Sequence, residues 1–258
     1  MKDSHATLMK NVLLPRNVEV LGKLASSRAL LAFDFDGTLA PIVTGPTQAG
    51  MRESTRRLFR RVCELFPTAV ISGRGRGDVA GRLCGARVKY VVGNHGAENG
   101  RRSKLKKSTL DEARAQLTEL AAHTPGLQLE DKGFSLSVHY RRVKHPIAAR
   151  RSILKVLEQL RRPLRAMGGK MVINVLPEGA HDKGDALLAL CKQTHSDLAL
   201  YVGDDVTDED VFSMRQRKRV VGVRIGRSAR SAAEYYVKTQ DDIDALLRRL
   251  IELRGAAP

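Results

Sequence analysis

Five short apolar runs along the chain predict buried β-strands. Each contains aliphatic or β-branched residues and is followed by polar or glycine-rich sequence, which is typical of strands covered on both faces of a parallel sheet. The runs lie at residues 29–33, 68–71, 88–92, 198–202 and 220–225. They predict a largely parallel sheet.

Segments between these runs have the periodicity of helices. Residues 54–65 place Leu58, Val62 and Leu65 on one face, with Arg and Glu among the other positions. Residues 185–192 (DALLALCK) predict a second, more apolar helix. Because strands and helices alternate, we expect a doubly wound, Rossmann-like α/β core.

The middle of the chain has a different pattern. Residues 134–141 follow an Asp-Lys-Gly turn and alternate between apolar and polar side chains, which predicts a half-exposed antiparallel strand. A second strand is expected at residues 171–176, and helices at 109–122 and 146–160. This mixture predicts an inserted α+β module that covers the core as a cap.

The predicted boundaries place the cap at residues 101–177 and the core at residues 1–100 and 178–258. The net charge of the chain is +17. Residues 101–176 contain 17 Lys and Arg against 6 Asp and Glu, so the cap carries +11 of this charge. Such an excess favours anionic partners, whether nucleic acid, a membrane surface or a phosphorylated substrate.

The composition predicts a cytoplasmic protein with its own core and no membrane contact. Hydrophobic residues make up 42% of the chain, which argues against disorder. The cysteines Cys63, Cys84 and Cys191 stand far apart without a C-x-x-C pair, so we expect small buried residues rather than disulfides or zinc ligands. We find no signal-like apolar run at the N-terminus and no stretch of about 18 apolar residues.

The strongest chemical signal follows the first predicted strand, where the sequence reads FDFDGTL. Asp34 and Asp36 lie at the carboxyl end of this strand, where open α/β sheets bind ligands. One carboxylate can attack phosphorus, and the other can protonate the leaving oxygen and then accept a proton from water. Gly37 permits a tight turn whose amides face a phosphate. The alternative is a solvated acidic turn.

A second acidic cluster, GDDVTDED at residues 203–210, follows the fourth predicted strand. Oxygen ligands without His or Cys suit Mg²⁺. The run alone is equally typical of a solvated acidic helix start, which the helix dipole favours. A calcium loop is excluded because the glycine required at its sixth position is missing.

Two weaker signals lie elsewhere. Ser72, in the stretch ISGR after the second predicted strand, and Lys183, which opens a predicted helix in the stretch DKG, are both suited to binding a phosphoryl group. Taken alone, an ordinary turn and a solvated lysine are the commoner roles. The chain has no P-loop motif, and Gly75 begins only a poor dinucleotide-binding motif.

In this order, the stretches DFDGTLAPI, ISGR, DKG and GDDVTDEDVF resemble the haloacid dehalogenase superfamily of phosphatases. A closer resemblance, to trehalose-6-phosphate phosphatases, rests on GNHGAE at residues 93–98, EDK at 130–132, HYR at 139–141 and the full GDDVTDED run. It covers residues 28–250. It implies a Mg²⁺-dependent enzyme that hydrolyses trehalose 6-phosphate to trehalose and phosphate through an aspartyl-phosphate.

The resemblance also implies roles for individual residues. Asp34 would be the nucleophile and Asp36 the general acid/base, with Ser72 and Lys183 on the phosphoryl group. The Mg²⁺ site would comprise Asp34, the carbonyl of Asp36, Asp204, and Asp205 and Asp208 in support. The substrate would be bound by Arg74, Asn94, His95, Glu98, Glu130, Lys132, His139 and Arg141.

One stretch departs from the family pattern. Where the family has a Glu and a basic residue before a proline, this chain has Asn174 and Leu176 before Pro177. Asn can still hydrogen-bond a hydroxyl, but the charge is lost. A phosphatase for another glycosyl phosphate, such as a phosphorylated glycosyl-glycerate, is therefore an alternative.

Two further alternatives belong to other functional classes. The net charge is compatible with a basic nucleic-acid-binding protein, although the sequence has no recognition motif and no interleaving of aromatic and basic residues. A catalytically silent regulatory relative is disfavoured because Asp34, Asp36, Lys183 and Asp204 are all present. The expected partner is a small sugar phosphate, and the sequence does not predict an oligomeric state.

Overall fold

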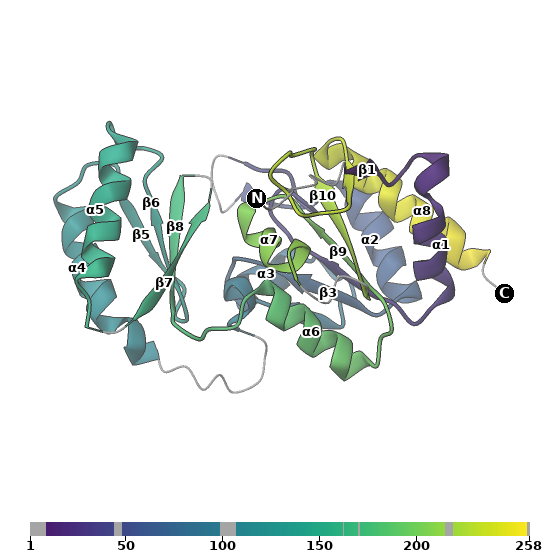
Figure 1. Ribbon diagram of the computed structural model, residues 1–258, viewed down its shortest axis with the longest axis horizontal. Helices are drawn as coiled ribbons and strands as arrows, with labels where there is room; N and C mark the ends of the chain where they lie inside the picture. The colour runs from purple at the N-terminus through teal and green to yellow at the C-terminus, as the bar shows by residue number, and fades with distance from the viewer. Residues whose placement is uncertain are drawn as a thin grey trace, which may run out of the picture.

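The computed structural model describes residues 9–43, 48–98, 107–161, 163–169, 171–214 and 219–256. Within these residues it contains a parallel seven-stranded sheet flanked by helices and a separate antiparallel four-stranded sheet (Figure 1). The predicted α/β core with an inserted α+β cap is therefore confirmed. None of the described helices combines the length and the apolar character needed to cross a membrane.

The strand order of the large sheet is β1-β11-β10-β9-β2-β3-β4. Its strands are β1 (Lys10–Asn11), β2 (Leu30–Phe33), β3 (Thr68–Ile71), β4 (Tyr90–Val92), β9 (Ala199–Gly203), β10 (Val220–Ile225) and β11 (Tyr235–Val237). All five core strands expected from the sequence are present, and the short strands β1 and β11 extend one edge.

Helices cover both faces of this sheet. They are α1 (Glu19–Ser26), α2 (Glu53–Leu65), α3 (Arg76–Arg82), α6 (Lys183–Thr194), α7 (Glu209–Phe212) and α8 (Ile243–Gly255). Alternate residues of β2 serve the two faces, because Leu31 and Phe33 pack with α1, α2 and α8 while Leu30 and Ala32 pack with α6 and α7. This double burial explains why the core strands are apolar without a break.

The cap is formed between β4 and α6. Its sheet has the order β5-β6-β8-β7, with strands β5 (Gln128–Asp131), β6 (Leu136–His139), β7 (Leu164–Gly169) and β8 (Val172–Pro177). The helices α4 (Asp111–Ala122) and α5 (Pro146–Glu158) pack on one face of this sheet (Figure 1). The opposite face is turned toward the core.

This orientation corrects the prediction of a half-exposed strand at residues 134–141. The polar side chains of Ser135 and Ser137 are fully buried, because the face that carries them meets the core rather than solvent. The hydroxyl of Ser137 donates to Oδ1 of Asn174 on β8 at 2.6 Å. The alternating pattern therefore predicted the strand correctly, but the prediction that its polar face is exposed to solvent was wrong.

Two smaller predictions are also corrected. The buried face of α2 consists of Thr55, Phe59 and Val62, while Leu58 and Leu65 are only partly buried at its edge. Cys84 is exposed rather than buried, since it follows α3 in a turn with left-handed backbone, φ 49°. Cys63 and Cys191 are half-buried, and all three cysteines are free.

Candidate active site

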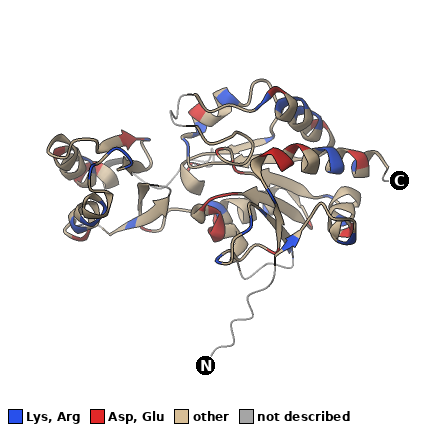
Figure 2. Ribbon diagram, turned by 90° about the horizontal axis from the view of Figure 1, so that it is seen from above, with Lys and Arg blue, Asp and Glu red and all other residues tan. Residues whose placement is uncertain are grey.

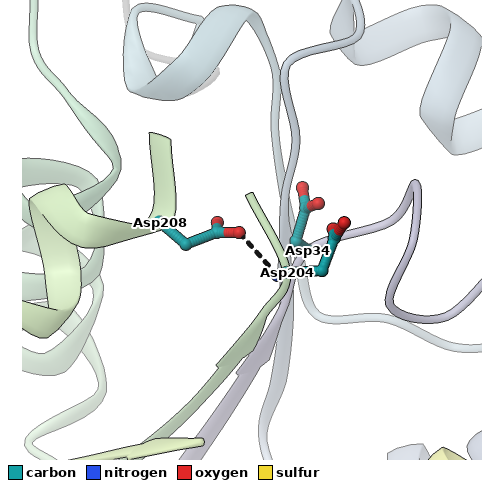
Figure 3. Close-up of side chains that lie close together, drawn as sticks. All are labelled: Asp34, Asp204 and Asp208. Carbon is teal, nitrogen blue, oxygen red and sulfur yellow. Dashed lines mark hydrogen bonds between the residues drawn. The ribbon is translucent and has the colours of Figure 1, made fainter. Parts of the chain in front are cut away.

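The carboxyl ends of β2 and β9 bring the two acidic clusters together. These strands pair in parallel, with Phe33 opposite Val202, and the N–H of Asp34 donates to the carbonyl of Val202 at 2.8 Å. Asp34 and Asp204 therefore leave the sheet side by side, and their carboxylates point in the same direction (Figure 3). Both side chains are buried.

Lys183 lies beneath this pair at the start of α6. Its Nζ donates to Oδ1 of Asp34 at 3.0 Å and to Oδ1 of Asp208 at 2.7 Å, and its side chain is only 2% exposed. Tyr201 of β9 also donates to Oδ1 of Asp208, at 2.7 Å. The helix is held in place by a capping box in which Asp182 accepts from the N–H of Asp185.

Burial and mutual repulsion set the electrostatics of these groups. Burial raises the pKa of Asp34 well above its usual value, and the neighbouring carboxylates add to this effect while Lys183 opposes it. Burial alone would lower the pKa of Lys183, but Asp208 and Asp34 outweigh it and raise that pKa well above the usual value. The lysine is therefore charged. The neighbouring carboxylates repel one another, and a bound cation would reduce this repulsion.

The carboxylate oxygens around Asp34 are suited to binding a small cation that prefers oxygen ligands. Oxygens of Asp34, Asp204 and Asp208 lie within 4.8 Å of one another. A Cβ on Gly37, where φ is 83°, would stand 2.3 Å from a carboxylate oxygen of Asp204, so only glycine permits this approach. An all-oxygen set of this kind suits Mg²⁺ better than zinc or copper.

Asp208 has a different position from the other two carboxylates. Its Oδ2 accepts from the N–H of Asp204 at 2.8 Å (Figure 3) and from the N–H of Asp205 at the same distance. Its Oδ1 accepts from Lys183 and Tyr201. Since both of its oxygens are bonded within the protein, Asp208 holds the backbone at residues 204 and 205 in place. It is less available than Asp34 and Asp204 as a direct metal ligand.

Asp36 is held from the opposite side by Arg74. The Nε and NH2 groups of this arginine each donate to one oxygen of Asp36 at 2.7 Å. Arg74 is fixed in turn by Asp78 on α3, which also accepts from Arg82 at 2.8 Å. The bidentate pair sets the direction of the Asp36 carboxylate.

A cavity of about 340 Å³ lies between core and cap. Eleven of the predicted site residues line it: Asp34, Asp36, Arg74, His95, Glu130, Lys132, His139, Arg141, Lys183, Asp204 and Asp205. Asn174, singled out because it departs from the family pattern, lines it too, and so do residues that the sequence did not indicate, such as Gln128, Met171 and Thr207. Ile42 and Val43 add an apolar section to the wall.

The cap side of the cavity is a hydrogen-bonded set around Glu130. Its Oε2 lies 3.0 Å from Nε2 of His139 and 3.5 Å from Nζ of Lys132. The bond with His139 lowers the pKa of Glu130, so this carboxylate is ionised. Lys132 also donates to the carbonyl of Gly73 at 3.1 Å, which joins the cap to the core.

Four of the predicted residues do not line the cavity. Besides Asp208, these are Ser72, whose Oγ accepts from the N–H of Arg74 at 3.2 Å, and Asn94 and Glu98, which are bonded to each other. They support the loops of the site. Their predicted contacts with substrate stay predictions.

His95 is buried in the cavity wall beside Gly73. Burial and the charges of Lys183 and Lys132 hold its pKa well below the usual value, so the ring is neutral near pH 7. A Cβ on Gly73 would stand 2.5 Å from the ring. The glycine in ISGR is thus explained by close packing against histidine.

Tyr201, Asp78 and Arg82 are structural partners that sequence reasoning missed. Tyr201 could have been found from the sequence, because it lies in a run expected to be buried on both faces. A buried tyrosine hydroxyl needs a hydrogen-bond partner, which points to a polar network nearby. Asp78 and Arg82 are spaced by four residues on a helix that follows ISGR, which hints at an ion pair but not at its link to Asp36.

Comparisons with known proteins agree with this arrangement. A model of the trehalose-phosphatase family matches residues 32–241. The probable trehalose-phosphate phosphatase 4 of Oryza sativa subsp. japonica is 31% identical over 254 residues, covering 91% of this chain and 69% of that protein. The probable trehalose-phosphate phosphatase H of Arabidopsis thaliana is 32% identical over 266 residues, covering 91% and 75%.

Solved structures share the fold. The C-terminal domain of trehalose-6-phosphate phosphatase from C. albicans has a TM-score of 0.78 at 23% identity, and the likeness covers 98% of this chain and 99% of that chain. Trehalose-6-phosphate phosphatase from Aspergillus fumigatus has a TM-score of 0.66 at 23% identity, covering 95% and 99%. The family match over most of the sequence, together with these relatives, shows that the chain belongs to the trehalose-phosphatase family, whose members are phosphoric monoester hydrolases.

Proposed function

We propose that this protein hydrolyses trehalose 6-phosphate to trehalose and phosphate in a Mg²⁺-dependent reaction with a covalent intermediate on Asp34. The observation that carries the proposal is the buried network of Asp34, Lys183 and Asp208 beside Asp204, opening into a cavity that the cap completes. Family membership and the names of the relatives agree with it.

In the first step a carboxylate oxygen of Asp34 attacks phosphorus, and the bond from phosphorus to the sugar oxygen breaks. Asp36 enters this step protonated, with one of its oxygens released from Arg74, and gives its proton to the leaving oxygen. Water then attacks the aspartyl-phosphate, Asp36 accepts its proton, and phosphate leaves with Asp34 regenerated. Lys183 remains charged throughout and balances the negative charge near the phosphoryl group, with Ser72 and its loop on the other side.

Asp34, the carbonyl of Asp36 and Asp204 would hold the metal, with Asp205 and Asp208 in support. Bound Mg²⁺ would supply positive charge that polarises the phosphoryl oxygens and neutralises the carboxylates. Two observations support this assignment: the raised pKa of Asp34 among neighbouring carboxylates, and the close approach of Asp204 to the backbone at Gly37.

The cap would bind the part of the substrate that does not react. Glu130 accepts hydrogen bonds from sugar hydroxyls, and His139, Lys132 and Arg141 surround it at the cavity wall. Arg74 and His95 contact the substrate from the core. We propose the boundaries 1–100 and 178–258 for the catalytic core and 101–177 for the cap, and a cytoplasmic location remains a prediction.

One observation favours a related substrate as a second candidate. Asn174 lines the cavity as a neutral amide, and its Oδ1 is already bonded to Ser137. Asn174 also makes a side-chain hydrogen bond with His95. A neutral amide in place of an acidic side chain would not repel a glycosyl phosphate that carries a carboxylate. A phosphorylated glycosyl-glycerate is such a compound.

A substrate panel tests the proposal. Phosphate release would be measured from trehalose 6-phosphate, glucose 6-phosphate, sucrose 6-phosphate and a phosphorylated glycosyl-glycerate at equal concentrations with Mg²⁺. The proposal expects the highest kcat/KM with trehalose 6-phosphate. A higher value with the glycosyl-glycerate would select the second candidate, and no release from any of them would reject the phosphatase assignment.

A further inference from the structure

A buried contact between cap and core lies outside the cavity. Ser135, just before β6 of the cap, is fully buried, and its hydroxyl donates to Oδ1 of Asn94 in the core at 2.7 Å. Asn94 is also fully buried, and its Nδ2 donates to Oε2 of Glu98 at 2.9 Å and to the carbonyl of Lys132 at 3.4 Å. The oxygen and the nitrogen of this amide are thus both engaged within the protein.

The backbone around Asn94 is tied to the loop of the site. Its N–H donates to the carbonyl of Arg74 at 2.8 Å, and the N–H of His95 donates to the carbonyl of Ser72 at 3.0 Å. Asn94 has left-handed backbone, φ 51°, which asparagine tolerates better than most residues. Asn94 is therefore joined through its side chain to the cap and through its backbone to the loop that carries Arg74.

We propose that Asn94 and Ser135 are positioning residues whose hydrogen bond fixes the cap turn at residues 131–135 against the loop at residues 72–74. This bond keeps Glu130 and Lys132 of the cap in register with the pair of Arg74 and Asp36 in the core. The role differs from the sugar contact that the family resemblance implies for Asn94.

The contact between cap and core is polar, and this suits two parts that have to separate when substrate enters. A sugar phosphate has to enter between cap and core, and we infer that the groups that meet there are exposed to water while it enters. Hydrogen-bonded groups exchange their partners for water at little net change in free energy, whereas an apolar contact of equal area would resist separation. The bond from Lys132 to the carbonyl of Gly73 has the same character.

The test is the variant Ser135→Ala, assayed with two substrates. Ser135 does not line the cavity, so this variant removes no group that touches the ligand. We expect kcat/KM for trehalose 6-phosphate to fall about tenfold, the effect of one lost buried hydrogen bond. A small aryl phosphate has no second sugar for the cap to hold, and its kcat/KM should change less than about twofold.

Asn94→Ala should give a split at least as large, because it also removes the bonds from Asn94 to Glu98 and to the carbonyl of Lys132. The double variant should be no worse than Asn94→Ala alone, because Ser135 has then already lost its partner. Thr55→Val is the matched control. It removes a buried hydroxyl that bonds Asp244 between α2 and α8, away from the cap, and should leave both activities intact. Equal losses with both substrates, no loss in Ser135→Ala, or additive losses in the double variant would each overturn the proposal.

The inference rests on the proposed function only for the choice of substrate, and a second measurement separates the two. Thermal unfolding of the parent, both single variants and the double variant measures the coupling of Asn94 and Ser135 without turnover. The shifts in Tm should be clearly non-additive. Additive shifts would overturn the positioning role, whereas a parent protein that leaves trehalose 6-phosphate intact would reject the proposed function alone.

Discussion

The network around Lys183 in the core and the pair of Glu130 and His139 on the cap differ in burial. On the core side, the side chains of Asp34, Lys183 and Asp208 are 7%, 2% and 0% exposed and share direct hydrogen bonds. On the cap side, Glu130 and His139 are 47% and 39% exposed. Buried charges depend strongly on one another, whereas exposed pairs are screened by water and salt. The buried network of the core should therefore be sensitive to the loss of any one member, whereas the pair of Glu130 and His139 should depend less on each other.

The cap is the more basic part by count, since residues 101–176 carry +11 of the net charge of +17, but both parts carry residues of both signs. Basic and acidic side chains are interspersed over the helices of core and cap (Figure 2). Contrasting substitutions at the cavity are thus the way to test the difference between its two sides.

Asp34→Asn should have the largest effect. It keeps the shape of the side chain but removes the attacking carboxylate, so turnover should fall by about 10⁴-fold or more with every phosphate ester. Circular dichroism would show that the fold survives. Near-normal activity in this folded variant would rule out a covalent intermediate on Asp34.

Lys183→Met should damage both activity and stability. It leaves Asp34 and Asp208 buried without their counter-charge, which typically costs about 3–5 kcal/mol of unfolding free energy. Urea unfolding measures this loss. Lys192→Met, on the exposed face of the same helix, is the control and should unfold like the parent. Equal stability of the two variants would show that the buried network is not coupled as described.

Removal of the metal should disable the core side of the cavity without a mutation. Excess chelator should abolish turnover of all substrates, and added Mg²⁺ should restore it. Mg²⁺ should also raise the Tm of the parent but not of Asp204→Ala, since a ligand stabilises only the state that binds it. An equal rise in Asp204→Ala would place the metal elsewhere.

Glu130→Ala sharpens the comparison from the cap side. It should lower kcat/KM for trehalose 6-phosphate by about 10–100-fold through lost contacts with sugar hydroxyls, and leave a small aryl phosphate nearly unchanged. Glu119→Ala, an exposed acidic residue on α4, is the control. If both substrates lose activity equally, Glu130 supports the core site rather than specificity.

The smallest expected effect concerns pH. Burial, aided by Asp182, raises the pKa of Asp210 to about 6, so the folded protein loses stability as this group ionises between about pH 4 and pH 6. Asp210→Asn should therefore add on the order of 1 kcal/mol near pH 7.5, a modest figure because the group is only half-buried, and less near pH 5. Urea unfolding at both pH values measures this, and a larger gain at the lower pH would contradict the assignment.

The sequence predicted the parts of the fold that are buried on both sides. The run at residues 220–225 is strand β10, because a strand covered by helices has to be apolar throughout. The edge strands β1 and β11 were missed, being short and only partly buried. Strand β7 was missed as well, since its sequence ends in two glycines, which weaken any strand pattern.

The same division applies to the site. Asp34 and Asp204 were each expected at the carboxyl end of a strand, and the family resemblance implied that they share a Mg²⁺ site. The parallel pairing of β2 and β9 in the structure brings the two residues together. The partners of Arg74 on α3 and the bond between Ser135 and Asn94 could not be predicted, since they depend on how separate elements pack. The exposure of β6 was misjudged for the same reason, because the core that covers its polar face lies far away in sequence.

The most direct test of the account is identification of the phosphorylated residue. The protein would be mixed with trehalose 6-phosphate and Mg²⁺, quenched in acid and reduced with borohydride, which converts an aspartyl-phosphate to homoserine, and its peptides would be analysed by mass spectrometry. The account predicts homoserine at position 34, dependent on both Mg²⁺ and substrate and lost in Asp34→Asn. Homoserine at another position, or turnover retained in Asp34→Asn, would contradict it.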